Sequence, residues 1–598
     1  MAKPRTALPF PLVLALFTPV LLAQAGPSVT TMPAAPVASN PVAPSPVAAA
    51  PVAPSPVAAA QVPPTPEAAN PVVPSPVAST LVTPTPATVA SVAPKPAPPP
   101  DQPREAGTLY AQICAECHGA DRLGITGPPL IPENFGRLKR EEAAKLILEG
   151  RPATQMPPFG DRLSLAEAQG LVDLVFTPLP DTPEWGLERI RQSHLPLVPP
   201  EKLPDRPLHN ADPLNLFVVV ETGDHHATIL DGDRLEPLHR FATRRALHGG
   251  PKFSNDGRFV YFASRDGWIS KFDLHSFQTV AEIRAGINTR NLAVSGDGRY
   301  VAVANYLPHN LVILDARDLL PLKLIPVQDD EGKTSRVSAV YAAPPRHSFV
   351  AALKDIPEVW EILVADDPLP VYNGPMHDYR MGEGTALVKG PFPVRRTKLD
   401  GFLDDFFFTQ NYQVLIGAAR DGSQGQAVNL DVRQRIATLD LDGMPHLSSG
   451  ITWERDGRTL LVTPHLSKPE VSVIDLGTWE TIKRIPTLGP GFFARSHENS
   501  PYAWVDVFSG PNKDAMHVID KQTLEIVATL RPEPGKTAAH VEFDRYGKYA
   551  LVSIWEDEGA LVIYDAKTLQ EVKRLPMRKP SGKYNVYNKI TRSEGTSH

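Results

Sequence analysis

The stretch FSNDGRFVYF (253–262) joins a tight turn to a strand. Its Asp256-Gly257 dipeptide is typical of a hairpin turn, and the apolar residues after it predict a half-buried strand. The same unit returns as VSGDGRYVAV (294–303), WERDGRTLLV (453–462) and FDRYGKYALV (543–552). A hairpin that recurs along the chain indicates an all-β architecture built from repeats.

A second unit closes each repeat, namely a strand that ends in aspartate and is followed by a turn. Examples are ILDGDRLEPL, KFDLHSFQTV, ILDARDLLPL, VIDLGTWETI, VIDKQTLEIV and IYDAKTLQEV. Antiparallel units with a period of about 40 to 45 residues are typical of propeller blades. The closing aspartates are spaced accordingly. Asp273 and Asp315 lie 42 residues apart, and Asp475, Asp520 and Asp565 follow one another at 45 residues.

The repeat length also sets the number of blades. At ~45 to 50 residues per blade, the 396 residues from Leu203 to His598 predict an eight-bladed β-propeller, which we place at 205–598. The stretch NGPMHDYRMGEGTALVKGPFPVRRTKLD (373–400) breaks the rhythm and is interpreted as an inserted loop.

The charge balance excludes one class of partner. The net charge is −6 and the pI is near 6.3, so the chain lacks the basic excess that nucleic acid binding requires. Apart from its N-terminus, the sequence has no run of 18 or more apolar residues. We therefore expect no stable membrane insertion once the N-terminus has been processed.

The first 25 residues predict a signal peptide. Lys3 and Arg5 give it a positive start, LPFPLVLALFTPVLLA (8–23) an apolar core, and Ala23-Gln24-Ala25 a cleavage site. A retained membrane anchor is the alternative, although the prolines weaken a spanning helix. No cysteine stands at the cleavage site, which excludes a lipoprotein, and the expected compartment is the bacterial periplasm.

Residues 26–103 repeat segments such as NPVAPSPVAAA, which consist of alanine, valine, proline and serine. This composition cannot bury a core and favours extended polyproline II. We interpret the segment as a disordered, semi-rigid linker, which extends by ~3.1 Å per residue.

The chain holds two cysteines, Cys114 and Cys117, and both lie in ICAECHG (113–119) next to His118. A disulfide redox centre is one interpretation, but it leaves the histidine unexplained. In a CxxCH motif the thiols form thioethers with heme vinyl groups, and the imidazole becomes an axial iron ligand. The surrounding GTLYAQICAECHGADRLGITGPPL resembles class I cytochromes c, so we expect one covalent heme c in an all-α domain over 104–180.

Such a domain needs a second axial ligand, and Met156 in RPATQMPPFG (151–160) is the candidate. A methionine thioether raises the potential of the iron compared with a second histidine, which suits an electron acceptor. The alternative is that Met156 only packs in the core. An amphipathic final helix is predicted from about Ser164, and a proline-rich connector (181–204) leads to the propeller.

A c-type cytochrome followed by an eight-bladed propeller resembles the cytochrome cd1 family, whose propeller holds heme d1 on its axis. The resemblance covers about 104–598, and RRALHGGPKFSNDGRFVYF, AGINTRNLAV, NYLPHNLVILD and PSGKYNVYN match family segments in order. It implies that His248, which precedes two glycines, is the proximal ligand of the heme d1 iron. It also implies that Arg265 and Arg290 pair with heme d1 carboxylates. Without the resemblance, a loop histidine and two solvated arginines would be the ordinary interpretation.

Two activities compete within this family. Its nitrite reductases, which form nitric oxide, place two histidines on the distal side of heme d1. The matching segments here are LKDIPEVWE, with Lys354, Asp355 and Ile356, and FLDDFFF, with Asp404 and Asp405. Because an ionised aspartate repels nitrite and does not readily supply a proton, we expect reductase chemistry to be disabled.

The other activity is the last step of heme d1 biosynthesis, which oxidises a propionate of dihydro-heme d1 to an acrylate, and LKDIPEVWE resembles that branch. A third branch lacks a cytochrome domain, so ICAECH argues against it. The resemblance implies that His540 accepts a proton, that Tyr584 orients the carboxylate, and that His446, in a mobile GMPHLSSG loop, is the distal ligand of the substrate iron. Ordinary packing is the alternative for His540 and Tyr584.

The oxidation also needs partners. Heme c carries one electron at a time, so an external acceptor, expected to be a small periplasmic redox protein, must empty it between steps. The cytochrome cd1 nitrite reductase is an expected recipient of heme d1. A protein that only carries or delivers heme d1 is the alternative from another class, although it would leave heme c unexplained.

Overall fold

The computed structural model describes residues 103–591, apart from gaps at 126, 136–137, 151–155, 182, 369–370, 374–385, 389, 420–422 and 424. The predicted signal peptide and nearly all of the predicted linker lie outside the described residues. Within the described part, no helix is long and apolar enough to span a membrane.

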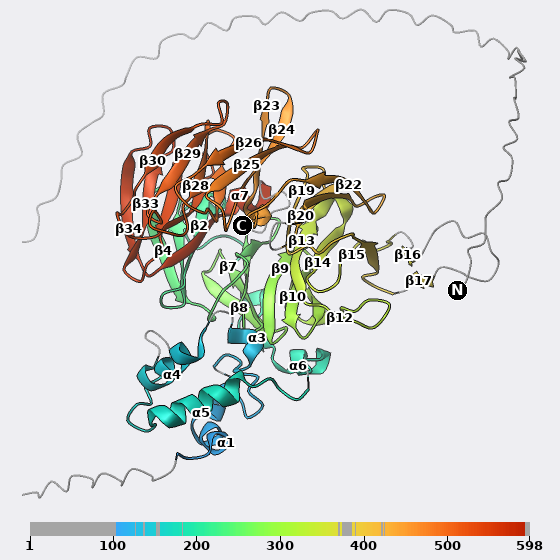
Figure 1. The fold of residues 1–598 in the computed structure, drawn as a ribbon, viewed down its shortest axis with the longest axis vertical. Coiled ribbons are helices and arrows are strands. Elements are labelled where there is room, and N and C mark those ends of the chain that lie inside the picture. The colour runs from blue at the N-terminus through green and yellow to red at the C-terminus, as the bar shows by residue number, and fades with distance from the viewer. Residues whose placement is uncertain are drawn as a thin grey trace, which may run out of the picture. The chain divides into compact units, whose positions relative to one another are not determined.

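Short helices form the domain that carries the CxxCH motif (Figure 1). Ser164 caps the last helix, because its hydroxyl accepts the Glu167 backbone N–H while the Glu167 carboxylate accepts the Ser164 N–H at 2.9 Å. The predicted final helix is therefore confirmed. Leu109, Leu171 and Val175 lie in its core. The helices are α1 (Ala106–Leu109), a π-helical turn (Tyr110–Cys114), α2 (Ala115–His118), α3 (Pro132–Phe135), α4 (Arg140–Glu149) and α5 (Leu165–Phe176).

In the described part of the chain, eight antiparallel sheets of four or five strands follow, so the predicted eight-bladed propeller is confirmed. In the first four blades the strands are β35 (Pro580–Asn585), β2 (Leu216–Glu221), β3 (His226–Asp231) and β4 (Glu236–Ala242); β5 (Lys252–Phe253), β6 (Phe259–Ala263), β7 (Trp268–Asp273) and β8 (Gln278–Arg284); β9 (Asn288–Val294), β10 (Tyr300–Leu307), β11 (Asn310–Asp315) and β12 (Pro321–Pro326); and β13 (Val337–Ala343), β14 (Ser348–Leu353), β15 (Glu358–Leu363) and β18 (Val394–Lys398).

The other four blades repeat this order. They consist of β19 (Asp405–Phe408), β20 (Val414–Ala418), β21 (Gly425–Asn429) and β22 (Gln434–Leu439); β23 (Ile451–Arg455), β24 (Arg458–Pro464), β25 (Glu470–Asp475) and β26 (Glu480–Pro486); β27 (Ala494–Ser496), β28 (Tyr502–Asp506), β29 (Met516–Asp520) and β30 (Ile526–Leu530); and β31 (Ala538–Phe543), β32 (Tyr549–Ile554), β33 (Gly559–Asp565) and β34 (Glu571–Met577).

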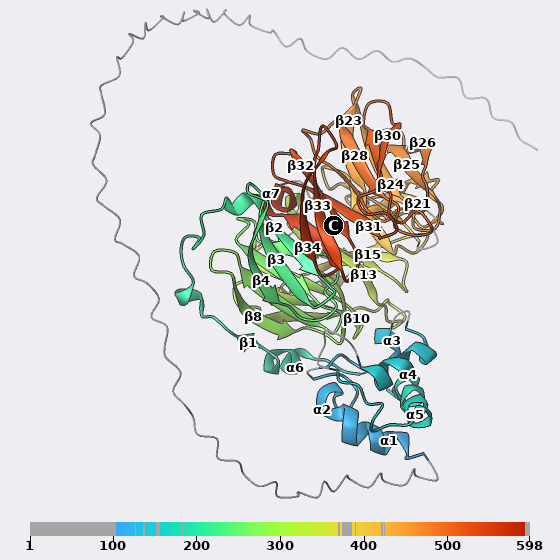
Figure 2. The same cartoon turned by 90° about the vertical axis from the view of Figure 1, so that its left-hand side faces the viewer.

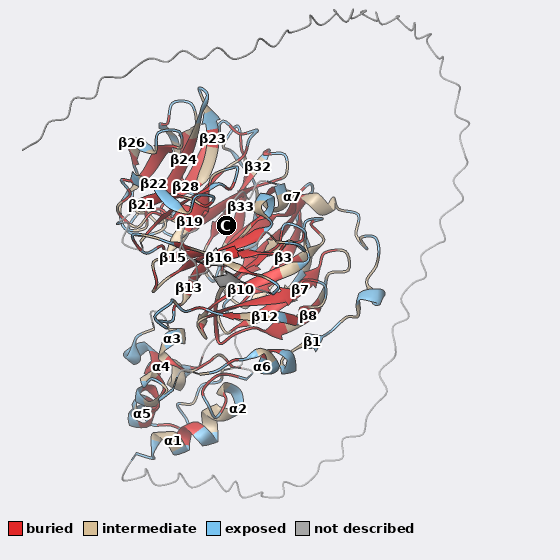
Figure 3. Ribbon diagram, turned by 90° about the vertical axis from the view of Figure 1, so that its right-hand side faces the viewer, coloured by how far each residue is buried: buried red, intermediate tan, exposed pale blue. Residues whose placement is uncertain are grey.

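The turn residues explain the regularity of the blades. Gly257 adopts φ +74°, as the Asp-Gly turn requires, and the Ser254 hydroxyl accepts the Phe259 N–H at 2.9 Å. The closing aspartates also accept backbone N–H groups, as Asp565 does from Thr568 at 2.7 Å. Buried residues predominate in most strands, whereas outer strands such as β22 are exposed (Figure 3).

The last strand of the chain closes the ring, since β35 pairs with β2 in an antiparallel register. Helix α7 (Val586–Thr591) follows β35 directly and contacts β2 and β5 (Figure 2). Inner strands from the two ends of the propeller sequence thereby become neighbours. This closure brings residues near 584 to the loop near 248.

The insertion is shorter than the sequence indicated. Residues 394–398 form β18, the fourth strand of their blade, and pair with β15. Before it, β16 (Val371–Asn373) pairs with β17 (Ala386–Val388), and residues 374–385 lie outside the described part. The predicted loop over 373–400 therefore includes one blade strand.

The connector contains α6 (Leu187–Gln192) and β1 (Leu195–Pro196), which pairs with β8. Arg284 at the end of β8 donates to the Gly124 carbonyl at 2.9 Å, in the loop after the CxxCH motif. Asn288 donates to the Glu133 carbonyl at 2.9 Å. These bonds attach loops of the cytochrome domain to the connection between β8 and β9.

Candidate functional site

The CxxCH motif consists of the last residue of the π-helical turn and all of α2, and both of its thiols are free. His118 donates its Nδ1–H to the Pro128 carbonyl at 2.8 Å, so Nε2 carries the lone pair that an axial ligand needs. Burial lowers the pKa of His118, which favours the neutral ring. A Cβ on Gly127 would lie 2.7 Å from His118 Cε1, so the support of this ring is tight. The donor set fits a covalent heme c.

Met156, the predicted second ligand, is half-buried and follows the gap at 151–155. Its role as a ligand stays a prediction. We expect Met156→Ala to lower the heme c potential and leave covalent attachment intact, because thioether ligation raises the potential. A redox titration measures this shift, with Met577→Ala in the propeller as the control. If the potential and the methionine–iron charge-transfer band are both unchanged, another residue is the ligand.

The loop before β5 carries His248, Gly249 and Gly250, and the two glycines adopt φ of +82° and +64°. A Cβ on Gly249 would lie 2.6 Å from the Asn291 Cβ, so the backbone approaches the neighbouring strand where only glycine fits. This close approach fixes the position of His248 on the loop.

His248 has the hydrogen bonds of a metal-ligand histidine. Its Nδ1 donates to the Arg290 carbonyl at 2.7 Å, so Nε2 accepts from the Arg265 guanidinium at 2.9 Å and from that of Arg290 at 3.0 Å. Burial, with the charges of both arginines, holds the pKa of His248 well below its usual range and keeps the ring neutral. The structure thus brings three predicted residues together.

Three cations surround the ring of Tyr306. Lys354, Arg336 and Arg265 lie 5.9, 5.7 and 5.8 Å from its centroid. Sequence reasoning singled out neither Arg336 nor Tyr306, although Tyr306 belongs to the matched segment NYLPHNLVILD. Because Arg336 already pairs with Asp355, this group of cations is partly neutralised, and a ligand carboxylate would have to compete for it.

One electrostatic expectation is wrong. Asp404 does not stand as an unpaired charge that repels anions, because it forms an ion pair with Lys354. Asp405 accepts the Tyr341 hydroxyl at 3.0 Å and the Ser448 N–H at 2.8 Å. The argument against nitrite reduction then rests on the segment LKDIPEVWE. In this segment Ile356 is buried and cannot donate a proton.

His446 is buried in the loop after β22. Its Nδ1 donates to the Phe492 carbonyl at 2.6 Å, and its ring lies 4.3 Å from the Phe492 ring. Its backbone N–H donates to the Pro464 carbonyl at 2.9 Å. The bond to the Phe492 carbonyl leaves the lone pair on Nε2, which lies 3.3 Å from the Ser448 hydroxyl, and the distal-ligand role stays a prediction.

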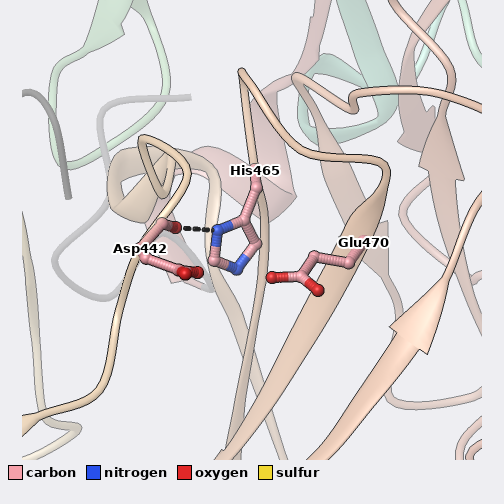
Figure 4. A group of neighbouring side chains, drawn as sticks. All are labelled: Asp442, His465 and Glu470. Carbon is pink, nitrogen blue, oxygen red and sulfur yellow. Dashed lines mark hydrogen bonds between the residues drawn. The ribbon is translucent and has the colours of Figure 1, made fainter.

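A polar network holds the same loop (Figure 4). Asp442, His465 and Glu470 place ligand-type atoms within 4.8 Å of one another, and the Asp442 carbonyl accepts from His465 Nδ1. Arg484 donates to the Glu470 carboxylate at 2.9 Å and to that of Asp442 at 3.3 Å, and Lys468 pairs with Asp442. Since these cations already neutralise both carboxylates, we interpret the group as an ion-pair network that anchors the His446 loop.

The rings of the predicted catalytic pair lie together, and one of the two residues, Tyr584, lines a cavity of about 180 Å³. His540 is 1% exposed, and its ring centroid lies 5.3 Å from that of Tyr584 and 4.7 Å from that of Phe493. Among the residues that the structure describes, neither ring nitrogen of His540 has a hydrogen-bond partner. The cavity is lined by residues that include His248, Gly249, Gly250, Phe492, Phe493 and Tyr584.

Electrostatics favour a neutral His540. Burial, together with the positive charges of Lys583 and Arg495, holds its pKa well below the usual histidine range. Burial raises the pKa of Tyr584, which keeps the phenol protonated. A neutral imidazole can accept a proton, and a phenol can donate a hydrogen bond to a carboxylate.

A buried pair that the sequence did not reveal fixes the backbone of His540. This residue has φ +52° at a β-bulge, a strained conformation for a side chain of this size. The Asp506 carboxylate accepts the His540 N–H at 3.1 Å, and the Lys583 ammonium donates to the His540 carbonyl. Asp506 also accepts the N–H groups of Phe492 and Phe493 at 2.7 and 2.9 Å. The pair therefore links the base to the Phe492–Phe493 segment.

We expect Asp506→Asn to lower turnover by roughly 10²-fold, the cost of a misplacement of about 1 Å, and to leave substrate binding almost unchanged. Asparagine keeps one side-chain oxygen, and its NH₂ group cannot accept a hydrogen bond. At least one of the three hydrogen bonds from backbone N–H groups is therefore lost. Steady-state rates and substrate titrations measure the two effects. Asp520→Asn, in an exposed turn where the aspartate also accepts backbone N–H groups, is the control. Wild-type turnover in Asp506→Asn would remove the positioning role.

Comparisons with known proteins agree with this arrangement. The family model described as the cytochrome D1 heme domain matches residues 211–371 and 388–589. The model described as cytochrome C oxidase, cbb3-type, subunit III matches residues 101–175. The two matches coincide with the propeller and the cytochrome domain.

Three relatives differ in their similarity to this chain. The dihydro-heme d1 dehydrogenase of Pseudomonas aeruginosa is 56% identical over 498 residues, which is 83% of this chain and 96% of the relative. The nitrite reductase of Stutzerimonas stutzeri is 25% identical over 80% of this chain and 92% of its own length. Protein NirF of P. aeruginosa is 30% identical over 62% of this chain and 90% of its own length.

A solved structure matches over the same region. The structure of dihydro-heme d1 dehydrogenase NirN in complex with DHE superposes with a TM-score of 0.76 at 55% identity. The match covers 81% of this chain and 100% of the solved one.

Proposed function

This chain belongs to the cytochrome D1 heme domain family, and we propose that it is a periplasmic oxidoreductase of heme d1 biosynthesis that oxidises one propionate of dihydro-heme d1 to an acrylate. The observation that carries the proposal is the 56% identity to a dihydro-heme d1 dehydrogenase, against 25% to a nitrite reductase. The cytochrome domain supports it further, because removing two electrons requires a redox group.

The reaction converts CH2–CH2 to CH=CH and releases two protons and two electrons. His248 would hold the substrate iron through its Nε2 lone pair, once the Arg265 and Arg290 guanidinium groups turn to the substrate carboxylates. Tyr584, on the wall of the cavity, would orient the reacting propionate. His540 would then accept a proton at a ring nitrogen, and its closed surroundings exclude water.

Covalent heme c, when bound to Cys114, Cys117 and His118, supplies a one-electron acceptor, so the two electrons leave in two steps. An external acceptor must therefore oxidise the cytochrome domain between the steps, and a small periplasmic redox protein is the class that we propose. Release of the product to a cytochrome cd1 nitrite reductase is the second interaction that we propose. The predicted signal peptide over 1–25 supports the periplasmic location.

Rapid mixing tests the proposed function directly. The oxidised protein, mixed with dihydro-heme d1 in the absence of oxygen, should show reduction of its c-type heme at the absorption bands of that heme. The acrylate product serves as the control, because it has no electrons to give in this reaction. If dihydro-heme d1 also leaves the c-type heme oxidised, the proposal fails.

The site also predicts weak nitrite reduction. The protein loaded with heme d1 and supplied with reductant and nitrite should form little nitric oxide. The reason is that Ile356 offers no proton and Asp404 is held by Lys354, where a reductase needs distal histidines. A nitric oxide electrode measures the rate against a nitrite reductase as the positive control. Comparable rates would identify the chain as a reductase.

A further inference from the structure

Behind His540 and Tyr584, the inner strands and α7 enclose polar groups that the proposed mechanism does not use. Arg495 lies on β27, Glu542 on β31 and Lys589 on α7. Arg495 is 8% exposed and Glu542 is 3% exposed. Arg495 Nη2 and Glu542 Oε2 lack a hydrogen-bond partner within the described part of the chain. Buried groups of this kind are normally satisfied, and unsatisfied ones mark a site for a ligand or a functional role.

The internal contacts leave these groups only loosely paired. Glu542 Oε2 lies 3.9 Å from Arg495 Nε and 3.7 Å from Lys589 Nζ, beyond the range of a hydrogen bond. The other oxygen, Oε1, accepts from Asn588 Nδ2 at 3.3 Å. One carboxylate thus lies between two cations without a direct hydrogen bond to either.

The cluster holds more basic groups than acidic ones. Arg495 and Lys589 together face the single carboxylate of Glu542, and Lys252 lies near enough to add its own positive charge. Burial, together with mutual repulsion, lowers the pKa of Lys589 well below its usual range. Because a bound anion would stabilise the charged form of Lys589, the cluster is suited to bind an anion.

The cluster is adjacent to the catalytic pair. Arg495 and Lys589 both lie close enough to lower the pKa of His540, after burial and Lys583. Lys589 Nζ lies 5.4 Å from the centroid of the Tyr584 ring. The cavity in front of Tyr584, about 180 Å³, is small for a macrocycle but large enough for a carboxyalkyl side chain.

We propose that Arg495 and Lys589 bind the carboxylate of the propionate that His540 deprotonates. This inference rests on the proposed function. A carboxylate next to the reacting C–H bond opposes loss of the proton, because negative charge then accumulates beside it. Two cations bound to that carboxylate would offset this charge, as preorganised donors do at other sites where charge develops in a transition state. The Glu542 carboxylate lies between the two cations.

The step balances with the external one-electron acceptor that the proposed function already requires. Two C–H bonds break: one proton passes to His540 and the second is released to solvent, while the two electrons leave one at a time through the cytochrome domain to that acceptor. Arg495 and Lys589 exchange neither protons nor electrons. Their role is to bind the carboxylate and to stabilise the charge beside it.

Two substrates separate this role from a structural one. The wild-type protein and Arg495→Gln are titrated with dihydro-heme d1 and with its analogue in which the reacting propionate is a primary amide. For wild type, the acid should bind on the order of 10- to 100-fold more tightly than the amide, the worth of a charge-assisted hydrogen bond. In Arg495→Gln this preference should largely disappear, and Lys589→Gln should reduce it.

Controls make each outcome decisive. Arg346→Gln, which removes another mostly buried arginine that pairs with Glu361, should keep the wild-type preference. If Arg495→Gln does not fold, Arg495→Lys, which keeps the cation, should fold and keep part of the preference. An unchanged preference for the acid in Arg495→Gln and Lys589→Gln would overturn the inference. If wild type itself fails to oxidise dihydro-heme d1 in the same experiment, the proposed function fails instead.

Discussion

His540→Ala is expected to slow the oxidation of dihydro-heme d1 by about 10²- to 10⁴-fold, the usual contribution of a general base. His540 is a buried imidazole that contacts Phe493 and Tyr584, two residues that line the cavity. Its surroundings keep it neutral, and no hydrogen bond within the described residues engages its nitrogens. Removing it takes away the proton acceptor but leaves His248 and the arginines that hold the substrate. The bound-substrate spectrum should therefore persist while single-turnover oxidation slows.

Two companion variants separate chemistry from binding. Tyr584→Phe removes only the hydroxyl, so it should also bind substrate and oxidise it slowly. His248→Ala removes the proposed iron ligand, so it should weaken or abolish the bound-substrate spectrum itself. Wild-type oxidation rates in both His540→Ala and Tyr584→Phe would place the proton acceptor elsewhere.

Cys114→Ala is expected to abolish covalent heme c and, with it, multiple turnover. The thiol forms one of the two thioethers, and without a stable one-electron acceptor the substrate electrons have no exit. Denaturing electrophoresis with heme staining measures attachment, and oxidation with an excess of acceptor measures turnover. Binding of dihydro-heme d1 to the propeller should remain, because His248 lies in a separate part of the fold.

Met156→Ala is the matched control for this variant, since it should keep the covalent heme and change only its potential. Wild-type turnover by a Cys114→Ala protein that lacks heme c would show that electrons leave by another route. The role of the cytochrome domain would then have to be abandoned.

The repeats made the fold predictable because their turns are local. Asp256-Gly257 and the closing aspartates act within a few residues, so their chemistry can be read from the sequence. The CxxCH motif is equally local, since three adjacent side chains specify a heme. The boundary of the insertion was harder to predict, because β18 is recognisable only from its pairing with β15.

The residues that support the site were not predictable, because they are far apart in the sequence and meet only in the fold. Asp506 and Lys583 reach His540 from two other blades, and the left-handed backbone of His540 has no signature in KTAAHVEFD. Lys583 stands beside Tyr584 in the matched segment PSGKYNVYN, which is the one signal that would have pointed to it. The Lys354–Asp404 pair shows the same limit, because the sequence showed the charge of Asp404 without the partner that neutralises it.

Mass analysis of the tetrapyrrole after reaction tests the central claim most directly. Dihydro-heme d1 is incubated with the protein and an excess of one-electron acceptor. The tetrapyrrole is then extracted and its mass is measured by mass spectrometry. The account predicts a product that is lighter by two hydrogen atoms and carries an acrylate, formed by wild type and far more slowly by His540→Ala. Recovery of unchanged dihydro-heme d1 from the wild-type reaction would contradict it.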